Sequence, residues 1–308
     1  MDNKLNVLKE YNLKEVSPVK LLRESGDNRV YIVGKNDKKV LRIGKKIEAN
    51  DLRFEYEFLN HLKTNRLPVA SWIVTKNGEF CTQTCEGSIA VLFDFIEGVH
   101  VAEGHLPSGE QAFNAGKMLA GISEASISFS SDAPRQRSIY SELGRVQDYK
   151  EVFLREFEGG DIFVNEVEEA LDFAERNQGM YSVIHNDYRM GNVFFDVTDK
   201  VNGVIDFDWC CFGPSIKDLA LGVLEWSYLD GQDGPDFSLF DAFLKGYNEV
   251  SAIKVEKDKE LFAWIKFSAL SDTATFFCDR LGFPNLKKRV SSSYMYKKYL
   301  FFKDYAGQ

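Results

Sequence analysis

The hydrophobic pattern of this chain changes character near Glu97 and Gly98, and this change limits the folds that the chain can form. Before this point, short apolar runs alternate with turn residues, a pattern typical of β-strands. The expected strands are Val19–Arg23, Arg29–Val33, Lys39–Ile43, Ser71–Thr75, Glu79–Thr84 and Ile89–Phe95. This part of the chain therefore predicts a small β-sheet domain.

One helix and one tight turn interrupt these strands. Apolar side chains at three- and four-residue spacing predict a helix from Glu48 to Lys63. The segment Lys76-Asn77-Gly78 predicts a hairpin between two of the strands, because Asn-Gly tolerates the positive φ angles of a type I′ turn. The sheet is therefore expected to be antiparallel and to be accompanied by one helix.

After Gly98, helical spacing dominates. The expected helices include Glu110–Ile127, Tyr149–Phe157, Val164–Arg176 and Phe237–Val250. Two short strand-like runs interrupt them, Val193–Asp196 and Gly203–Asp206. The 308 residues are enough for two domains. We therefore predict an α+β fold in which residues 1–97 form a small antiparallel sheet with one helix and residues 98–308 form a large, mainly helical domain.

The composition argues against several classes of protein. With 44% hydrophobic and 14% aromatic residues, the chain can bury a large core and is not expected to be disordered. The net charge of -9 argues against nucleic acid or an anionic membrane as a partner, and it favours a cationic substrate. The sequence shows no signal peptide and no membrane span of ~18 apolar residues, so a cytoplasmic location is expected. The oligomeric state is left open.

The five cysteines are expected to be reduced thiols. They are odd in number and lack the paired spacing of a zinc site. Cys81 and Cys85 are expected on one face of a strand, too far apart along it to form a disulfide easily.

The most informative residues lie in the segments Ser182–Asp196 and Gly203–Trp209. Asn192 follows Asp187 by five residues, and Asp206 follows after a second apolar run. In this order and spacing, the three residues resemble the catalytic and metal loops of the aminoglycoside phosphotransferase and choline kinase superfamily, which is related to the protein kinases. The resemblance covers most of the chain and implies a bilobal, protein-kinase-like fold.

The resemblance also implies a reaction, in which ATP is the phosphate donor and Mg²⁺ the metal. Asp187 is then the catalytic base, which orients the acceptor hydroxyl group and accepts its proton. Asn192 offers a neutral amide oxygen to the metal and Asp206 a charged one, and Mg²⁺ prefers such hard oxygen ligands.

Neighbouring residues are expected to assist. The guanidinium group of Arg189 would face the transferred phosphoryl group, although a salt bridge on the loop surface is an equally good interpretation. Asp208 would reach a second metal ion or the substrate. His185 and Asp218 are expected to support the loop through hydrogen bonds and to take no part in the chemistry.

The nucleotide is expected to bind the first domain. The loop Glu24–Arg29 lies where the family has its phosphate-covering loop, although it contains one glycine only. Strand alternation places Val40 and Arg42 on one face, so that Val40 would cover the adenine and Arg42 would contact the phosphates. Lys39, on the other face, remains the alternative phosphate ligand.

Two further elements complete the expected nucleotide site. In the helix after the Arg42 strand, Glu55 or Glu57 is expected to pair with Arg42, and only one of them can point inward because they face roughly 200° apart. The spacing to the following leucines resembles the family best with Glu55. The segment Ile89–Gly98 resembles the last strand and hinge of the family, where backbone groups of Asp94, Phe95 and Ile96 would bind the adenine edge.

The acceptor is expected to be a small molecule, and an aminoglycoside is the first candidate. Residues 151–176 contain nine acidic and two basic residues, and Asp230, Asp233 and Asp236 follow the metal loop. Clustered carboxylates would suit a polyamine sugar, although such runs also occur on solvated helix faces. Homoserine and choline-like acceptors remain open, because the metal loop resembles that of homoserine kinases as well.

Three other classes fit the sequence less well. A protein kinase would carry an Ala-Pro-Glu element and a long activation segment, and we find neither. A non-catalytic nucleotide-binding module would not need Asp187, Asn192 and Asp206 together. A metal-dependent hydrolase would leave the β-rich domain unexplained.

Overall fold

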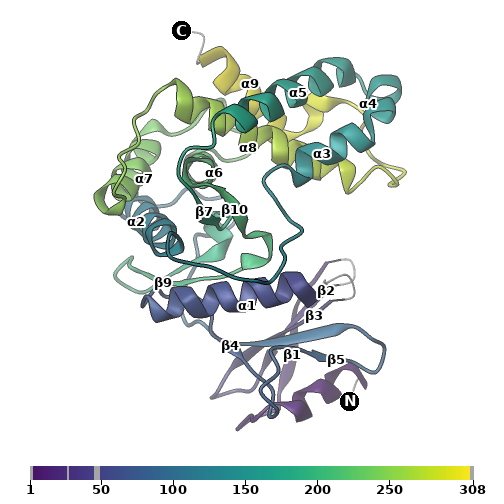
Figure 1. Cartoon of the computed structure of the whole chain (residues 1–308), viewed down its shortest axis with the longest axis vertical. Helices are drawn as coiled ribbons and strands as arrows, with labels where there is room; N and C mark the ends of the chain where they lie inside the picture. Colours follow the sequence, from purple (N-terminus) through teal and green to yellow (C-terminus); the bar gives the residue numbers. More distant parts are fainter. Residues whose placement is uncertain (1–2, 26–27, 45–48, 306–308) are drawn as a thin grey trace. The chain divides into compact units, whose positions relative to one another are not determined.

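The computed structural model describes residues 3–25, 28–44 and 49–305 (Figure 1). The chain divides into two compact units. The first comprises residues 1–98, 129–136 and 202–208, and the second comprises residues 99–128, 137–201 and 209–308. The first unit thus includes two later segments that a boundary at residue 97 assigns to the second domain.

The first unit is built on an antiparallel sheet. Among the described residues, six strands pair in the order β1-β2-β3-β6-β4, and β5 also pairs with β6. The strands are β1 (Val19–Ser25), β2 (Asn28–Val33), β3 (Lys39–Gly44), β4 (Trp72–Ile73), β5 (Thr82–Gln83) and β6 (Ile89–Asp94). The short helix η1 (Asn3–Glu10) precedes them, and α1 (Ala49–Thr64) follows β3.

Alternation along β3 gives the sheet two different faces. Leu41 and Ile43 are buried in a core that Val33, Leu92 and the η1 residue Leu8 share. The side chains of Val40 and Arg42 point to the opposite face, because successive strand residues alternate. Helix α1 lies along the sheet in Figure 1 and contributes buried aromatic and aliphatic side chains of its own.

Two predicted strands of this unit are wrong in length. Ser71–Thr75 contracts to β4 and Glu79–Thr84 contracts to β5, and each pairs with β6 instead of with the other. Strand β3 pairs with one edge of β6, so β4 and β5 must pair along the other edge. Each of them pairs with two residues of β6. Cys81 therefore lies outside a strand, and the shared face expected for Cys81 and Cys85 is not formed.

The turn at Lys76-Asn77-Gly78 is present, but it is not of type I′. Gly78 has a φ of 82°, whereas Asn77 does not have a positive φ. The amide of Gly78 donates to the carbonyl of Thr75 at 3.0 Å, and the amide of Thr75 donates to the carbonyl of Glu79 at 2.8 Å. This is a turn closed by a left-handed glycine, the usual geometry of a three-residue hairpin loop.

The second unit is largely helical. Its helices are α2 (Gly109–Ser126), α3 (Ser141–Asp148), α4 (Lys150–Glu156), α5 (Gly160–Arg176), α6 (Ser215–Ser227), α7 (Phe237–Val250), α8 (Lys259–Cys278) and α9 (Tyr294–Tyr305). Its strands β7 (Tyr181–Ile184) and β10 (Cys211–Pro214) pair antiparallel. β8 (Val193–Phe195) leads towards β9 (Val201–Val204), and the division between the two units falls inside β9.

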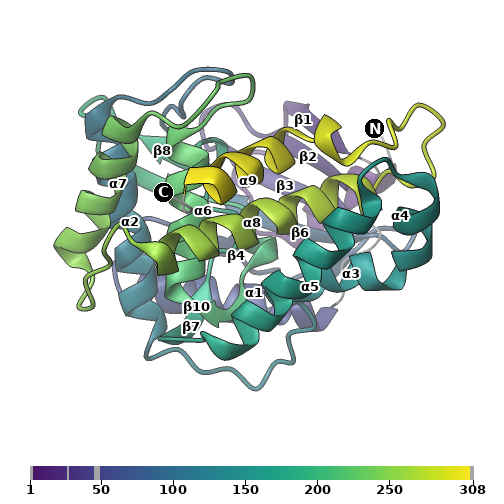
Figure 2. The same ribbon diagram turned by 90° about the horizontal axis from the view of Figure 1, so that it is seen from above.

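Close packing of helices defines the core of this unit. Helices α2 and α7 approach closely because Gly116 and Gly246 have no side chain, and a Cβ atom at either position would collide with the backbone of the facing helix. Helix α8 runs beside α5 and α9, and it also contacts α3 and α6 (Figure 2). No helix among the described residues is both long and apolar enough to cross a bilayer.

Candidate active site

The predicted catalytic loop of the second unit is held by a buried carboxylate. Strand β7 ends at Ile184, and Asp218 of α6 accepts hydrogen bonds from the backbone amides of His185 at 2.7 Å and Asn186 at 2.8 Å. Asp218 is 3% exposed, so these bonds satisfy a charge that would otherwise be buried without partners. The supporting role predicted for Asp218 is confirmed.

His185 and Asn186 fix the next part of the loop. The His185 ring is fully buried, and its Nδ1 atom accepts a hydrogen bond from the amide of Asp187 at 3.2 Å. Asn186 has a φ of 64°, a conformation that asparagine tolerates better than most residues. Its side chain bonds to Lys217 and to the carbonyl of Trp209. The predicted structural role of His185 is confirmed as well.

These supports present the Asp187 carboxylate to two donors. Oδ1 accepts from Nε of Arg189 at 2.6 Å, and Oδ2 accepts from Nδ2 of Asn192 at 3.0 Å. The same Nδ2 atom also donates to the carbonyl of Asp187 at 2.8 Å. Because its amide nitrogen is used in this way, Asn192 has its Oδ1 atom left to offer to a cation.

Charges of both signs surround Arg189. Its guanidinium lies 3.9 Å from the carboxylate of Asp272, and Glu225 pairs with Lys298 at 3.2 Å. Burial lowers the pKa of Arg189, but the carboxylates of Asp187, Glu225 and Asp272 outweigh this and raise it. Arg189 therefore stays charged and holds the Asp187 carboxylate in place. This second-unit cluster consists of Asp187, Arg189, Glu225, Asp272 and Lys298.

Burial also acts on the acids of this second-unit cluster. It raises the pKa of Asp272, and Arg189 opposes this only in part. Burial would raise the pKa of Glu225 too, but Lys298 and Arg189 hold it below its usual value. Glu225 is therefore ionised, because its cationic partners outweigh the effect of burial.

In the first unit, β3 and α1 bring together the predicted cation and its partner. Nη2 of Arg42 lies 2.8 Å from Oε2 of Glu55, and the guanidinium lies 5.4 Å from the centre of the Phe93 ring. The Nε atom of Arg42 is buried without a hydrogen-bond partner. Lys39 instead pairs with Asp37 at 2.5 Å and with Asp94 at 3.2 Å. The predicted pair of Arg42 and Glu55 is therefore formed.

The predicted metal loop continues from β9, and its backbone differs from the expected strand. The strand expected at Gly203–Asp206 ends at Val204, where the last bridge, to Val69, is made. Asp206 then takes a φ of 67°, which no strand residue adopts but which aspartate tolerates. Gly203 packs against Ile96, where any side chain would collide.

Arg42 is the centre of a first-unit cluster that consists of Arg42, Glu55, Asp206 and Asp208. Burial lowers the pKa of Arg42, but Glu55 and then Asp208 and Asp206 raise it. Oδ1 of Asp208 is buried without a hydrogen-bond partner. The Nε atom of Arg42 is thus a buried donor that a phosphate oxygen could satisfy. Oδ1 of Asp208 is a buried acceptor that a metal ion could satisfy.

The hinge and the phosphate-covering loop are partly described. The amide of Asp94 donates to the carbonyl of Ser71 at 2.8 Å, so Phe95 and Ile96 are better placed to supply an amide to an adenine. Of the predicted loop Glu24–Arg29, residues Gly26 and Asp27 lie outside the described residues.

The acidic stretch of the second unit does not form a free carboxylate surface. Six of its nine acids have basic partners: Glu151, Glu156, Glu158, Glu166, Glu168 and Asp172. Asp236 caps the N-terminus of α7 by accepting from the amides of Ser238 and Leu239. Asp230 and Asp233 of the later group line a cavity.

Sequence reasoning missed four charged residues around these clusters. Asp272, Glu225 and Lys298 come from α8, α6 and α9, and Arg135 donates to the carbonyl of Asp208 and pairs with Asp51 at 3.2 Å. Each lies in an ordinary segment that contains other charged residues, so no local motif marks it. Charged residues among the apolar residues of α6 and α8 were the one available signal.

Comparison with known proteins gives a consistent result. Residues 18–253 match the phosphotransferase enzyme family. The homoserine kinase of Zymomonas mobilis is 28% identical over 250 residues, which cover 78% of this chain and 73% of the relative. The homoserine kinase of Agrobacterium fabrum is 26% identical over 297 residues, which cover 92% and 87%.

Solved structures share the fold. An amicoumacin kinase in complex with AMP-PNP, Ca²⁺ and Ami has a TM-score of 0.75 at 15% identity, covering 99% of this chain and 93% of the other. A microcompartment-associated aminopropanol kinase has a TM-score of 0.75 at 18% identity, covering 98% and 96%. The predicted α+β, protein-kinase-like fold is confirmed.

Proposed function

The chain belongs to the phosphotransferase enzyme family and is an ATP-dependent small-molecule kinase, and we propose that its acceptor is a small amino acid with a free hydroxyl group. Homoserine is the first candidate. The observation that carries this proposal is the Asp187 carboxylate, held by Arg189 and Asn192 within a cluster of both charge signs.

Asp187 acts as the base in this proposal. Its two oxygens are held by Arg189 and Asn192, so the carboxylate is oriented before the acceptor hydroxyl reaches it. As the new P–O bond forms, Asp187 takes the hydroxyl proton. Arg189 balances its charge beforehand and would stabilise negative charge on the transferred group.

Magnesium and the nucleotide are assigned to the orphaned groups and their neighbours. When bound, Mg²⁺-ATP supplies the phosphoryl group and neutralises its charge. Asp206 and Oδ1 of Asn192 would hold the metal, and the unpaired Oδ1 of Asp208 suits the same chemistry. Arg42, with its unpaired Nε atom, would bind phosphate oxygens while Glu55 holds its Nη2 atom.

Two facts favour an amino acid over an aminoglycoside. The sequence relatives named above are homoserine kinases that align with most of this chain. In addition, most of the acids expected to wall a polyamine site are neutralised by lysine or arginine. A zwitterionic acceptor needs charges of both signs, and such charges surround Arg189. The aminoglycoside prediction itself stays untested.

An acceptor panel tests the proposal. Purified protein with Mg²⁺-ATP is given homoserine, choline, an aminoglycoside or a sugar alcohol, and ADP release is followed. We expect acceptor-dependent ADP release with homoserine and none when EDTA removes the metal. Faster turnover of an aminoglycoside than of homoserine would reject the proposed acceptor and restore the sequence-based one.

A further inference from the structure

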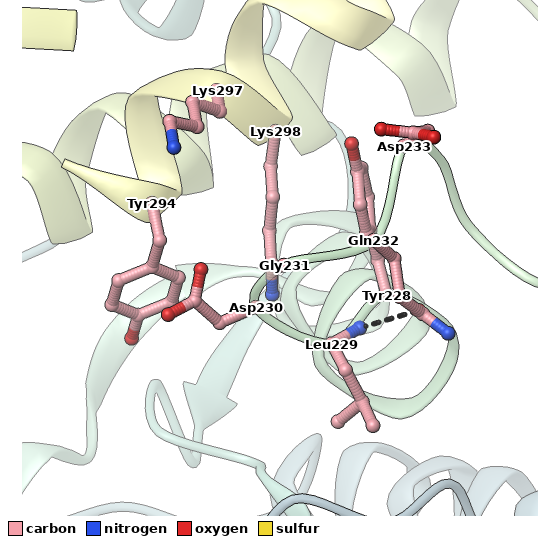
Figure 3. A pocket seen from close by; sticks show the side chains of 9 residues that line it. All are labelled: Tyr228, Leu229, Asp230, Gly231, Gln232, Asp233, Tyr294, Lys297 and Lys298. Carbon is pink, nitrogen blue, oxygen red and sulfur yellow. Dashed lines mark hydrogen bonds between the residues drawn. The ribbon is translucent and has the colours of Figure 1, made fainter. Parts of the chain in front are cut away.

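A cavity of about 140 Å³ lies in the second unit, between the start of α9 and the connection that follows α6 (Figure 3). It is lined by Tyr228, Leu229, Asp230, Gly231, Gln232, Asp233, Tyr294, Lys297 and Lys298. Pockets for drug-sized ligands have volumes of ~300–1,000 Å³. The cavity therefore suits a ligand of amino-acid size better than one with several sugar rings.

The cavity presents both charge signs. Lys298 extends from α9 toward the loop, and the carboxylate of Asp230 lies between Lys298 and Tyr294 in Figure 3. Lys298 is only 4% exposed and is paired with Glu225 at 3.2 Å. Within the described part of the chain, no ion pair engages Asp230, Asp233 or Lys297. A buried cation and a free carboxylate thus share one small cavity.

The cavity is coupled electrostatically to the predicted catalytic loop. Glu225 pairs with Lys298 and also acts electrostatically on Arg189, which holds Asp187. Burial of Tyr294 in the cavity wall, together with the nearby carboxylates of Glu225 and Asp272, raises the pKa of its phenol to about 12. The phenol therefore stays protonated and can donate a hydrogen bond.

We infer that this cavity is the subsite for the zwitterionic end of the acceptor, in which Lys298 binds the carboxylate and Asp230 binds the ammonium group. This inference rests on the proposed function. The ammonium group of Lys298 has three donor hydrogens. It can therefore donate to Glu225 and to the carboxylate of the acceptor at the same time. Tyr294 adds a neutral donor beside them. The hydroxyl end of the bound amino acid then extends toward Asp187.

The test compares three acceptors that differ in one charged group each. Homoserine has both groups, 3-amino-1-propanol lacks the carboxylate, and 4-hydroxybutyrate lacks the ammonium group. Lys298→Met should raise KM for homoserine about 10- to 100-fold, the loss expected for a charged hydrogen bond, and leave KM for 3-amino-1-propanol within about 3-fold. Asp230→Asn should raise KM for both amines and spare 4-hydroxybutyrate.

Controls separate recognition from folding. Lys245→Met removes an exposed lysine on α7 and should change none of the three KM values. Because Lys298→Met leaves Glu225 without its partner, the double variant Glu225→Gln with Lys298→Met removes both charges and should show the same loss of carboxylate selectivity. Calorimetric binding of homoserine, measured without nucleotide, gives a second readout.

The outcomes distinguish this inference from the proposed function. Equal KM increases for homoserine and 3-amino-1-propanol in Lys298→Met would overturn the inference while the kinase activity on homoserine stands. Homoserine that binds but is not phosphorylated by the wild-type protein, with binding lost in Lys298→Met, would support the subsite and reject the acceptor. No binding and no turnover of any of the three compounds would reject both.

Discussion

The first-unit cluster and the second-unit cluster differ in how completely they are satisfied. In the first, the Nε atom of Arg42 and the Oδ1 atom of Asp208 are buried without hydrogen-bond partners. In the second, both oxygens of Asp187 accept hydrogen bonds, and Glu225 is paired with Lys298. The first-unit cluster therefore contains buried polar atoms without partners, whereas the charged groups of the second-unit cluster already bond to one another.

This difference teaches which step each cluster serves. Unsatisfied buried polar groups are rare in folded proteins, so those of the first-unit cluster point to a ligand that arrives with its own charges. Groups that are held before the reaction lower the barrier, because they need little rearrangement when charge develops. We therefore expect changes in the first-unit cluster to weaken nucleotide and metal binding, and changes in the second-unit cluster to slow transfer or alter acceptor choice.

The largest expected effect is that of Asp187→Asn. Loss of the base should lower kcat at least ~10²-fold, while the affinity for Mg²⁺-ATP stays unchanged. Single-turnover kinetics and nucleotide titration measure the two quantities separately. A variant that turns over within a few-fold of wild type would remove Asp187 from the chemistry.

Asp206→Ala and Asn192→Ala should differ in degree. Removal of a charged metal ligand should weaken Mg²⁺-dependent nucleotide binding about 100-fold, and removal of a neutral one about 10-fold. Titration of ATP at several Mg²⁺ concentrations measures both. Equal losses, or activity that survives EDTA, would contradict the assignment of the metal.

A smaller effect is expected for Arg42. Arg42→Ala should raise KM for ATP about 10-fold or more, and Arg42→Lys should recover part of this because the charge survives without the planar fork. Lys39→Ala is the matched control, since Lys39 is engaged by Asp37 and Asp94. If the Lys39 variant is the impaired one, the first-unit cluster is not the phosphate site.

The smallest effect is a pH-dependent one on stability. The pKa of Glu225 is lowered from its usual 4.5, so its stabilising contribution is present above that pH and is lost as the pH falls through the folded-state pKa. Glu225→Gln should thus reduce the free energy of unfolding by about 1–3 kcal/mol near pH 7, and the difference should shrink below pH 4.5.

The exposed pair of Glu249 and Lys117 provides the control for this measurement, because such pairs contribute roughly 0–1 kcal/mol. Urea unfolding of wild type, Glu225→Gln and Glu249→Gln at several pH values gives the comparison. A Glu225 effect that is independent of pH would show that packing, and not charge, is lost.

The spacing of short strands and helices, which a sequence displays directly, predicted the fold class. The ion pair of Arg42 with Glu55 and the supporting role of Asp218 were instead implied by the resemblance to the kinase superfamily, and a structural role was expected for His185 in the same loop. The errors in strand length arose because segments far apart in the sequence compete for the same pairing partner. The segments of β4 and β5 share one edge of β6, and nothing within either segment reveals that.

Helix α8 shows a second reason why sequence reasoning fell short. Contacts with α3, α5, α6 and α9 surround it, so apolar residues occur on all its sides and no helical periodicity appears. Asp272 lies within this helix and therefore went unnoticed. Lys298 of α9 also went unnoticed, because its partner Glu225 lies 73 residues away in the sequence.

The most direct test of the whole account is ³¹P NMR of the reaction of the wild-type protein with Mg²⁺-ATP and homoserine. We predict the appearance of a phosphate monoester whose phosphorus is coupled to the side-chain methylene protons of homoserine, in an amount equal to the ADP formed, and its absence with Asp187→Asn. Release of ADP and inorganic phosphate without any monoester would contradict the account, because the carboxylates would then be serving hydrolysis.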